Sequence, residues 1–435
     1  MKHQISIKTK IPGPKSSNIL NKLKQKNGAW GTSYPLVHSS KGSGAYFTDI
    51  DNNTFLDFGS QIASNPLGYN HPALLKVSKE YSKRSPVKFA GQDFTVKEHL
   101  DLLDELLKIT PKNINAGFII NSGAEAVENA IKIAMRRKRS AKFGISFTGA
   151  FHGRTIGALS CTNSKAVHKK NYMSINMRRL PFSDEAPERL CQILDIEASP
   201  EDIGFVILEH IQGEGGYNLA TQKMVKGIRR ITKQYNIPFI ADEVQSGMGR
   251  TGKWWAFQNF NVNPDIMSSA KALQVGAALA NKSMFPREPG SLSSTWGGGH
   301  IIDLANGIAT IKTIKKQKLL QKNSRNGKYL KKGLYTIADY HPSIKNIRGI
   351  GLMQAFDFKT KKMRDNFVLQ MLKQGVVLLG CGHSGVRLVP PYIIKQDDID
   401  LFLTEMEKAL HVCGKKGIIH SGAICQYGQC ASSHS

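Results

Sequence analysis

Apolar and polar positions follow two alternating patterns along the middle of the chain. From about residue 70 to 320, segments with helical spacing of apolar residues are separated by short, continuous apolar runs. Three of these runs, 116–120, 204–208 and 238–241, are predicted to be buried strands. Strands that alternate with helices are typical of an α/β domain with a mostly parallel sheet. The pattern therefore predicts one large α/β domain in this part of the chain.

The two ends of the chain show a different pattern. Residues 1–30 are polar and basic and contain the breaker Pro12-Gly-Pro14, which predicts an extended arm. Short apolar segments on both sides of Asp51-Asn-Asn53 predict a hairpin. After Gly333 we expect a smaller α+β domain that packs with the N-terminal residues. Its predicted strands and helices are 351–358, 363–374, 375–379 and a closing helix from Asp397.

These patterns predict four divisions of the chain. They are an N-terminal arm with part of the small domain, the large domain, the C-terminal small domain, and a flexible tail: 1–65, 66–325, 326–412 and 413–435.

Composition narrows the class of protein. The chain has 435 residues, of which 40% are hydrophobic and 21% charged, values ordinary for a globular protein of two or three domains. It has no run of about 18 apolar residues, and its start lacks the long apolar stretch of a secretory signal. The net charge of +27 would suit a nucleic-acid partner. The basic residues are scattered without an aromatic stacking platform, so we expect a solvated basic surface and neither a nucleic-acid nor a membrane partner.

The six cysteines are too few for a disulfide scaffold, which favours a cytoplasmic protein. Three of them lie near the C-terminus with His420 and His434: Cys413, Cys425 and Cys430. Their spacing lacks the close pairs typical of zinc sites. No metal site is predicted.

Lys271 and Asp242 carry the first indication of chemistry. Asp242 ends the apolar run Phe239-Ile-Ala, and Lys271 is a lone lysine after a second apolar run. A pyridoxal-phosphate (PLP) enzyme needs a lysine amine for a Schiff base and an acid that keeps the pyridine nitrogen protonated. One such pair proves little by itself, because most Asp and Lys residues lie on surfaces.

The turn after the strand at 116–120 is a candidate phosphate site. Ser122 and Glu125 form an S-x-x-E capping box that predicts the start of a helix. A glycine turn at a helix N-terminus leaves backbone N–H groups available to a phosphate. An ordinary N-cap explains the same residues. The position at the carboxyl end of a strand, where α/β proteins bind ligands, favours the functional interpretation.

Four further segments combine polar groups with apolar or glycine-rich surroundings. Phe151 is suited to stack on a planar ring, and Arg154 to bind a carboxylate. Glu214 lies in a glycine-rich acidic loop, and Thr295 lies in a glycine-rich turn that would suit a phosphate. Arg387 stands in an apolar strand and needs an acidic partner, either a substrate carboxylate or Glu214. Each segment alone is equally compatible with a plain turn or a structural salt bridge.

Taken together, these segments resemble class III (ω-) aminotransferases, which are PLP enzymes of fold type I. The likeness runs from about Ile11 to Leu410. It is carried by S-G-A-E-A, F-H-G-R-T, D-E-V-Q-x-G-x-G-R-T-G, A-K-A-L and S-T-W-G-G, which begin at Ser122, Phe151, Asp242, Ala270 and Ser294. The resemblance implies a transaminase with a large PLP-binding α/β domain, a small domain built from both chain ends, and a homodimer.

The resemblance also implies roles for individual residues. Lys271 would bind PLP and move the substrate proton, and Asp242 would pair with the pyridine nitrogen. The cofactor contacts would come from Ser122, Gly123, Ala124, Phe151, His152, Asp242, Val244, Gln245, Lys271 and Thr295. Among these, Thr295 would reach the phosphate of the neighbouring subunit. Substrates would contact Ile62, Arg154, Glu214 and Arg387, with Glu214 neutralising Arg387 when the amino donor enters.

Within this family several amino donors compete. Residues 60–75 are similar to 4-aminobutyrate aminotransferases, whereas 271–276 and 294–298 are similar to L-lysine 6-aminotransferases. Ornithine aminotransferases usually have a tyrosine where Ile62 stands, which lowers that option. We expect a terminal amine, with 4-aminobutyrate slightly ahead, to pass to 2-oxoglutarate.

The sequence departs from the family pattern at two places, and two other classes of protein are considered. The C-x-x-C of animal 4-aminobutyrate enzymes is replaced by 121–124, so no iron–sulfur cluster is expected. The family's Glu-Pro before the acidic loop is Glu209-His210 here. An amino acid racemase would use the same lysine and stays open. A non-catalytic basic binding protein is disfavoured by the presence of Lys271 and Asp242.

Overall fold

The computed structural model describes residues 4–29, 34–91, 93–138, 140–292 and 296–415. The chain forms two compact units, which we describe one at a time. The larger unit comprises residues 72–321, and the smaller unit joins residues 1–71 to residues 322–435. The predicted divisions at 65/66 and 325/326 lie near these limits and stay a prediction about separate domains. Among the described residues, no helix has the length and apolar character that crossing a bilayer requires.

A seven-stranded sheet forms the centre of the larger unit. Its strand order is β4-β10-β9-β8-β7-β5-β6. The strands are β4 (Ala116–Ile120), β5 (Phe143–Phe147), β6 (Met177–Leu180), β7 (Ile203–Leu208), β8 (Phe239–Asp242), β9 (Ile266–Ser269) and β10 (Gly276–Ala280). Only β10 runs antiparallel to its neighbours β4 and β9. The other neighbouring pairs are parallel. The predicted α/β class with a mostly parallel sheet is therefore confirmed.

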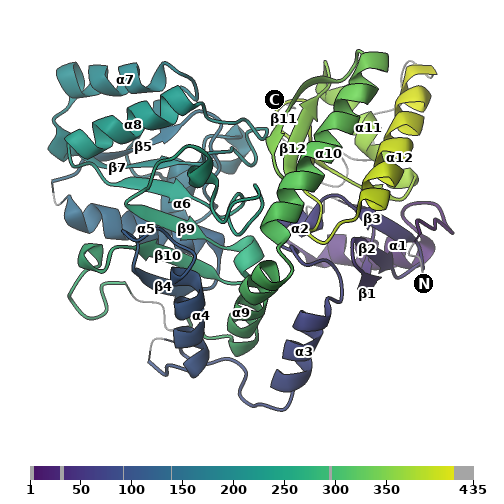
Figure 1. The fold of residues 1–435 in the computed structure, drawn as a ribbon, viewed down its shortest axis with the longest axis horizontal. Helices are drawn as coiled ribbons and strands as arrows, with labels where there is room; N and C mark the ends of the chain where they lie inside the picture. Colours follow the sequence, from purple (N-terminus) through teal and green to yellow (C-terminus); the bar gives the residue numbers. More distant parts are fainter. Residues whose placement is uncertain (1–3, 30–33, 92, 139, 293–295, 416–435) are drawn as a thin grey trace. The chain divides into compact units, whose positions relative to one another are not determined.

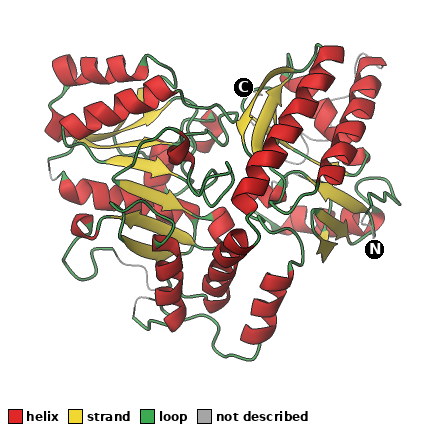
Figure 2. Ribbon diagram, viewed as in Figure 1, coloured by secondary structure: helices red, strands yellow, loops and turns green. Residues whose placement is uncertain are grey.

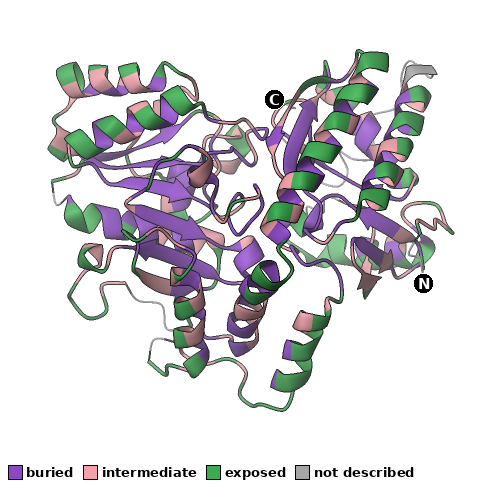
Figure 3. Cartoon of the chain, in the orientation of Figure 1, coloured by how far each residue is buried: buried purple, intermediate pink, exposed green. Residues whose placement is uncertain are grey.

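Burial explains why these runs form strands. Every residue of β5, β7, β8, β9 and β10 is buried, and Figure 3 shows this central layer covered on both sides. Strands buried on both faces need continuous apolar runs, which is the pattern in the sequence. The helices of this unit are α3 (Pro72–Tyr81), α4 (Lys97–Leu107), α5 (Gly123–Arg137), α6 (Ile156–Cys161), α7 (Ala186–Gln192), α8 (Gln222–Gln234) and α9 (Ile301–Lys316) (Figures 1 and 2).

Helix α5 has the most direct connection to the sheet. Its buried face includes Val127 and Ile131, which pack with Phe205, Ile207 and Ile240 of the strands in one apolar core. The predicted capping box is present at its start. Ser122 Oγ accepts a hydrogen bond from the Glu125 N–H at 3.3 Å, and Glu125 Oε2 accepts one from the Ser122 N–H at 2.9 Å. The helix N-terminus is thereby fixed at the edge of the sheet.

The smaller unit contains two four-stranded sheets. The first has the order β1-β2-β3-β13 and the second β11-β12-β15-β14. Their strands are β1 (His38–Ser43), β2 (Tyr46–Asp49), β3 (Thr54–Asp57), β11 (Lys345–Ile350), β12 (Met353–Asp357), β13 (Val376–Val377), β14 (Leu379–Cys381) and β15 (Gly385–Leu388). The predicted hairpin is β2–β3, in which Tyr46 pairs with Leu56. Strand β3 pairs with β13 through Leu56 and Val376, so both chain ends share one sheet.

Helices cover these sheets, and one of them corrects the sequence prediction. The helices are α1 (Pro14–Lys26), α2 (Ser60–Ala63), α10 (Leu319–Tyr340), α11 (Lys361–Lys373) and α12 (Gln396–Lys415). The expected extended arm is wrong for Pro14–Lys26, which is helical. Proline favours the first turn of a helix. The carboxylate of Asp51 accepts hydrogen bonds from the N–H groups of Lys15 and Ser16, each at 2.8 Å. This cap comes from a distant turn, so local sequence does not reveal it.

Candidate active site

Six strands of the large sheet are parallel, and five of them lead into predicted site residues at one edge of the sheet. The strands β4, β5, β7, β8 and β9 all run in the same direction, because β10 is antiparallel to both β4 and β9. The carboxyl ends of such strands are where α/β proteins bind ligands. The segments that follow them contain most of the predicted site residues, namely 121–124, 148–155, 209–217, 242–245 and 270–274.

Asp242 is the best-anchored group at this edge. It is the last residue of β8 and only 4% exposed. Its Oδ1 accepts hydrogen bonds from the Val244 N–H at 3.0 Å and from the Ser268 hydroxyl at 2.9 Å. Its Oδ2 lies 2.7 Å from Nδ1 of His152, which is itself buried. These three partners fix the orientation of a buried carboxylate.

Lys271 follows the neighbouring strand. Asp242 pairs with Ser268 across β8 and β9, and Lys271 begins the turn just after β9. Its φ of 46° is left-handed, a conformation that non-glycine residues seldom adopt. The Lys271 carbonyl accepts hydrogen bonds from the backbone N–H of Gln274 at 2.9 Å and from its side-chain amide at 3.1 Å. Backbone strain of this kind is often found at functional sites.

The start of α5 is suited to a phosphate. The first turn of a helix leaves backbone N–H groups without intrahelical acceptors, here those of Gly123 and Ala124. The surroundings leave no room for larger residues. A Cβ on Gly123 would lie 2.7 Å from Cγ1 of Val244, and one on Gly153 would lie 2.9 Å from the Ala124 methyl group. Gly153 also has a φ of +138°, so glycine is needed there for both reasons.

Phe151 and Gln245 lie on the loops after β5 and β8. The Phe151 ring meets the His168 ring edge-on, with centroids 5.7 Å apart. Oε1 of Gln245 is buried and has no hydrogen-bond partner among the described residues. A buried amide oxygen without a donor costs free energy, so a ligand group that donates a hydrogen bond would be favoured there.

Glu209 is a further buried group that sequence reasoning did not select. It ends the apolar run of β7, as Asp242 ends that of β8, and this parallel was the available signal. Its Oε1 accepts a hydrogen bond from the Phe151 N–H and its Oε2 accepts one from the Gly213 N–H, both at 2.8 Å. Burial raises the pKa of Glu209 to about 7, and the nearby Asp242 contributes in the same direction. The carboxyl group ties two site loops together.

His210 stands where the family has a proline. Its side chain is fully buried beside Phe239, Phe257 and Phe260, and burial lowers its pKa to about 3. The His210 carbonyl accepts a hydrogen bond from the Ala220 N–H at 3.1 Å. The acidic loop that follows is therefore held by a short antiparallel pairing, without the proline.

The predicted substrate residues of the larger unit lie nearer the protein surface. Arg154 is exposed, and its charge lies near enough to contribute to lowering the pKa of His168, after burial as the main cause. Glu214 is half-buried, and its Oε2 is 3.9 Å from Nζ of Lys165. Thr295 falls outside the described residues.

The other two predicted substrate residues belong to the smaller unit. Arg387 lies in β15, is 4% exposed, and is flanked by Ala355 of β12 and Leu379 of β14. Ile62 is 43% exposed. It belongs to a run of four left-handed residues, 60–63, that sequence analysis did not predict. Asp57 supports this turn, because its Oδ1 accepts hydrogen bonds from the N–H groups of Gly59 and Ser60 at 2.7 and 2.9 Å.

Comparison with known proteins identifies the class and then the family. A lysine and a buried carboxylate lie at the ends of adjacent strands of this α/β sheet, near a helix N-terminus. The family model for class-III aminotransferases matches residues 29–410, so the chain belongs to the class-III aminotransferase family. The enzyme is a fold type I transaminase whose cofactor is pyridoxal phosphate.

Relatives within the family have different names. The chain is 35% identical to an acetylornithine aminotransferase from Caldanaerobacter subterraneus over 87% of this chain and 95% of that protein. It is 32% identical to a 4-aminobutyrate aminotransferase from Dictyostelium discoideum over 93% and 90%. A solved structure of the lysine aminotransferase from M. tuberculosis, in the internal aldimine form, has a TM-score of 0.85 and 27% identity, covering 91% of this chain and 99% of that one.

Proposed function

We propose that this transaminase moves the terminal amino group of an ω-amino acid, with 4-aminobutyrate favoured, to 2-oxoglutarate. The products would be a semialdehyde and L-glutamate. The observation that carries the chemistry is the buried Asp242 carboxylate, held by three partners at the strand end beside the Lys271 turn. The donor is supported by the 4-aminobutyrate relatives and by the apolar Ile62, which offers no hydroxyl to an α-amino group.

The residues at the sheet edge fit the cofactor. PLP supplies an electron sink that stabilises negative charge at the substrate carbon. The N–H groups at the start of α5 would bind its phosphate, and the orphaned Oε1 of Gln245 would accept a hydrogen bond from its ring hydroxyl. Val244 would pack beneath the ring and Phe151 above it. The remaining proposed contacts are Ser122, Gly123, Ala124, His152, Asp242, Lys271 and Thr295.

Each catalytic group has one proposed task. Nζ of Lys271 would remove the proton from the carbon that bears the amine and later return one. Asp242 would hold a proton on the pyridine nitrogen, because a buried carboxylate favours a neighbouring positive charge. His152 and Ser268 would keep that carboxylate in place through the hydrogen-bonding contacts at 2.7 and 2.9 Å. Their fixed geometry avoids reorganisation during the reaction.

The substrates would be recognised by charge. Arg154 and Arg387 would bind the two carboxylates of 2-oxoglutarate. A single-carboxylate donor needs only one of them, so Glu214 would neutralise Arg387 in that half-reaction. In the structure, Oε2 of Glu214 lies 3.9 Å from Nζ of Lys165, and ion pairs near the surface contribute little to stability.

The assembly and location are part of the proposal. Thr295 would contact the phosphate bound by the neighbouring subunit, which makes a homodimer the smallest active form. Mixed dimers carrying Thr295→Ala in one subunit test this, since the change should weaken PLP binding in the partner's site. A cytoplasmic location is supported by four free thiols among the described residues, Cys161, Cys191, Cys381 and Cys413. Cell fractionation tests the location.

A panel of amino donors tests the function. With 2-oxoglutarate as acceptor, kcat/KM is measured for 4-aminobutyrate, L-lysine, L-ornithine, N-acetylornithine and β-alanine. We expect the ratio of 4-aminobutyrate to L-lysine to exceed one. A ratio below one would favour the L-lysine 6-aminotransferase alternative, which the structural likeness to the M. tuberculosis enzyme supports. Dominant activity with L-ornithine or N-acetylornithine would assign one of those donors instead.

The cofactor spectrum separates transamination from racemisation. Given only an amino donor, a transaminase converts the cofactor band near about 420 nm into one near about 330 nm, whereas a racemase does not. An unchanged spectrum together with racemised product would overturn the proposed amino transfer.

A further inference from the structure

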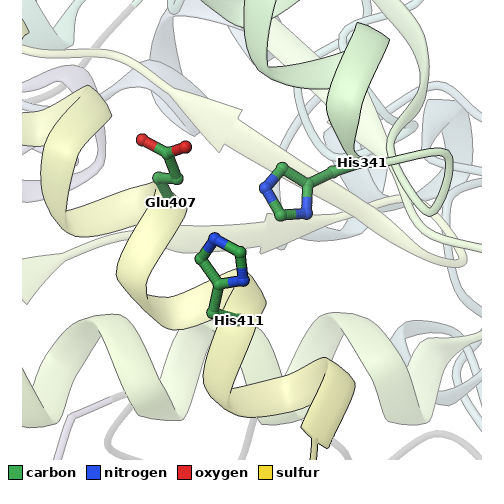
Figure 4. Close-up of side chains that lie close together, drawn as sticks. All are labelled: His341, Glu407 and His411. Atoms are coloured by element: carbon green, nitrogen blue, oxygen red, sulfur yellow. The ribbon is translucent and has the colours of Figure 1, made fainter.

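Three potential metal ligands gather in the smaller unit. His341 comes directly after α10, and Glu407 and His411 lie one turn apart on α12. Each side chain offers one ligand atom, and these atoms all lie within 4.8 Å of one another. Figure 4 shows Glu407 and His411 projecting from α12 with His341 opposite them. The two imidazole rings are nearly perpendicular, with centroids 5.0 Å apart.

The backbones that carry these side chains are held in place. The His341 N–H donates to the Ile337 carbonyl at 2.9 Å, and the His341 carbonyl accepts from the Ile344 N–H at 3.1 Å. Below the surface, Ile337 and Ile344 share one apolar core with residues of α12 that include Met406 and Leu410. The ligand cluster is therefore built on packed elements, so little of its geometry must be created on binding.

The ligand atoms are available. His341 is half-buried, and Glu407 and His411 are exposed. Within the described chain, no hydrogen bond or ion pair engages any of the three side chains, and only the two rings contact each other. A bound cation would also lie beside the C-terminal end of α10, where the helix dipole favours positive charge. The ligand atoms and the helix dipole both attract a cation, which opposes its repulsion by the protein's net positive charge. Salt screens that repulsion over distances of about 8–10 Å.

The donor set selects the kind of ion. Two imidazole nitrogens and one carboxylate oxygen are typical ligands of Zn²⁺, which takes a water as the fourth. Calcium and magnesium prefer oxygen ligands alone. Around tetrahedral Zn²⁺ the ligand atoms are about 3.3 Å apart, given metal–ligand distances of about 2.0–2.2 Å. The ligand atoms, now within 4.8 Å of one another, would come closer on binding by rotation of their side chains.

We propose that His341, Glu407 and His411 form a binding site for Zn²⁺ or a similar divalent transition-metal ion. The ion would link the end of α10 to α12 and stabilise the smaller unit without taking part in amino transfer. Sequence spacing does not reveal the site, because His341 is remote in sequence from the other two ligands. The proposal is independent of the amino donor.

Metal titration of the full-length, PLP-loaded enzyme tests the site. The protein is first stripped with a chelator and dialysed, then titrated with Zn²⁺ in a calorimeter. The variants are His341→Ala, His411→Ala and Glu407→Gln. The control is His383→Ala, which removes an exposed histidine from the same unit. Every protein keeps His420, Cys425, Cys430 and His434, so any binding by those residues stays constant across the series.

We expect one Zn²⁺ site per chain that is specific to the three ligands. Each histidine variant should weaken binding by at least about 100-fold, more than loss of a supporting outer contact does. Zn²⁺ should raise the melting temperature of the wild type and of the His383→Ala control, but not of the two histidine variants.

The outcomes that overturn the proposal are equally specific. Equal Zn²⁺ affinity in the wild type and both histidine variants would place the metal elsewhere. Equal weakening by His383→Ala would show non-specific surface binding. Circular dichroism and the cofactor spectrum establish that each variant is folded. Glu407→Gln keeps the size of the side chain, so a loss of affinity in that variant reports on coordination and not on packing.

Discussion

Two regions of the same candidate site differ in how firmly their charged groups are held. The base consists of His152, Glu209, Asp242 and Ser268. There each carboxylate oxygen has a partner within 3.0 Å, and all four residues are buried. The rim consists of Arg154, Lys165 and Glu214. There Arg154 is exposed, and the ion pair of Glu214 with Lys165 is 3.9 Å long.

This difference separates the choice of reaction from the choice of substrate. Buried groups with several partners keep one geometry, as pyridine-ring chemistry requires. Ion pairs near the surface contribute less to stability than fixed, buried contacts do. We infer that the base specifies the transaminase reaction and that the rim adapts to the donor and acceptor. Relatives that share the fold can therefore act on different ω-amino acids.

The largest effect is expected from removing the negative charge at the base. Asp242→Asn should lower kcat/KM by about 10³-fold, or about 4 kcal/mol, because the pyridine nitrogen would lose its acidic partner. PLP should still bind through the remaining contacts. The matched control is Ser268→Ala, which removes the 2.9 Å hydrogen bond to Asp242 but leaves the charge. It should cost no more than about tenfold.

Steady-state kinetics on both variants decide this point. Near-normal turnover in Asp242→Asn would show that the carboxylate does not serve the cofactor. Equal losses in the two variants would show that the hydrogen bond, and not the charge, is what matters at the base.

A smaller effect, of a different kind, is expected at the rim. Arg154→Ala should raise KM for 2-oxoglutarate by about 30-fold, or about 2 kcal/mol, and leave kcat within a few-fold. Arg189→Ala, which removes a partly exposed arginine paired with Glu197, is the control and should change neither constant. A large fall in kcat with an unchanged KM would place Arg154 in the base and not in the rim.

The smallest effect concerns the stability of the base and its pH dependence. Glu209 has a pKa of about 7 in the folded protein and an ordinary value of 4.5 when unfolded. Between these pH values the folded state holds the extra proton, so raising the pH favours unfolding. The wild type should lose on the order of 1 kcal/mol relative to Glu209→Gln between pH 6 and 7.5.

Melting temperatures of both proteins across this pH range provide the measurement. Burial also raises the pKa of Glu243 to about 7, but Glu243 is present in both proteins, so the difference isolates Glu209. A constant difference in melting temperature across the range would show that Glu209 titrates normally and is not part of a buried base.

Sequence patterns predicted the large unit better than the ends of the chain. The strands β7 and β8 appear as apolar runs because both of their faces are buried. Helix α1 could not be predicted, since the carboxylate that caps it belongs to Asp51 in a distant hairpin. The left-handed turn at 60–63 was also missed, because its supports come from Asp57 and from tertiary packing, not from glycine.

The candidate site likewise contains some features that local sequence reveals and others that depend on distant residues. Asp242 was selected because it directly follows an apolar run, and Gly123 because it lies in the turn between such a run and a helix, and both signals are local. The contact between His152 and Asp242 joins two residues that are 90 positions apart, and no local pattern encodes it. The hydrogen bond that Glu209 accepts from the Phe151 N–H is similarly non-local. The sequence therefore indicates candidate residues of the base, such as Asp242, whereas only the structure shows the hydrogen bonds between residues that are distant in sequence.

Covalent attachment of the cofactor tests the central claim most directly. The account holds that the base carries PLP on Lys271, at the end of the strand that pairs with the Asp242 strand. Borohydride reduction of the PLP-loaded enzyme, followed by peptide mapping, should place the pyridoxyl label on the peptide containing Lys271 and on no other. A label on another lysine, or a fully active enzyme without any label, would contradict the account.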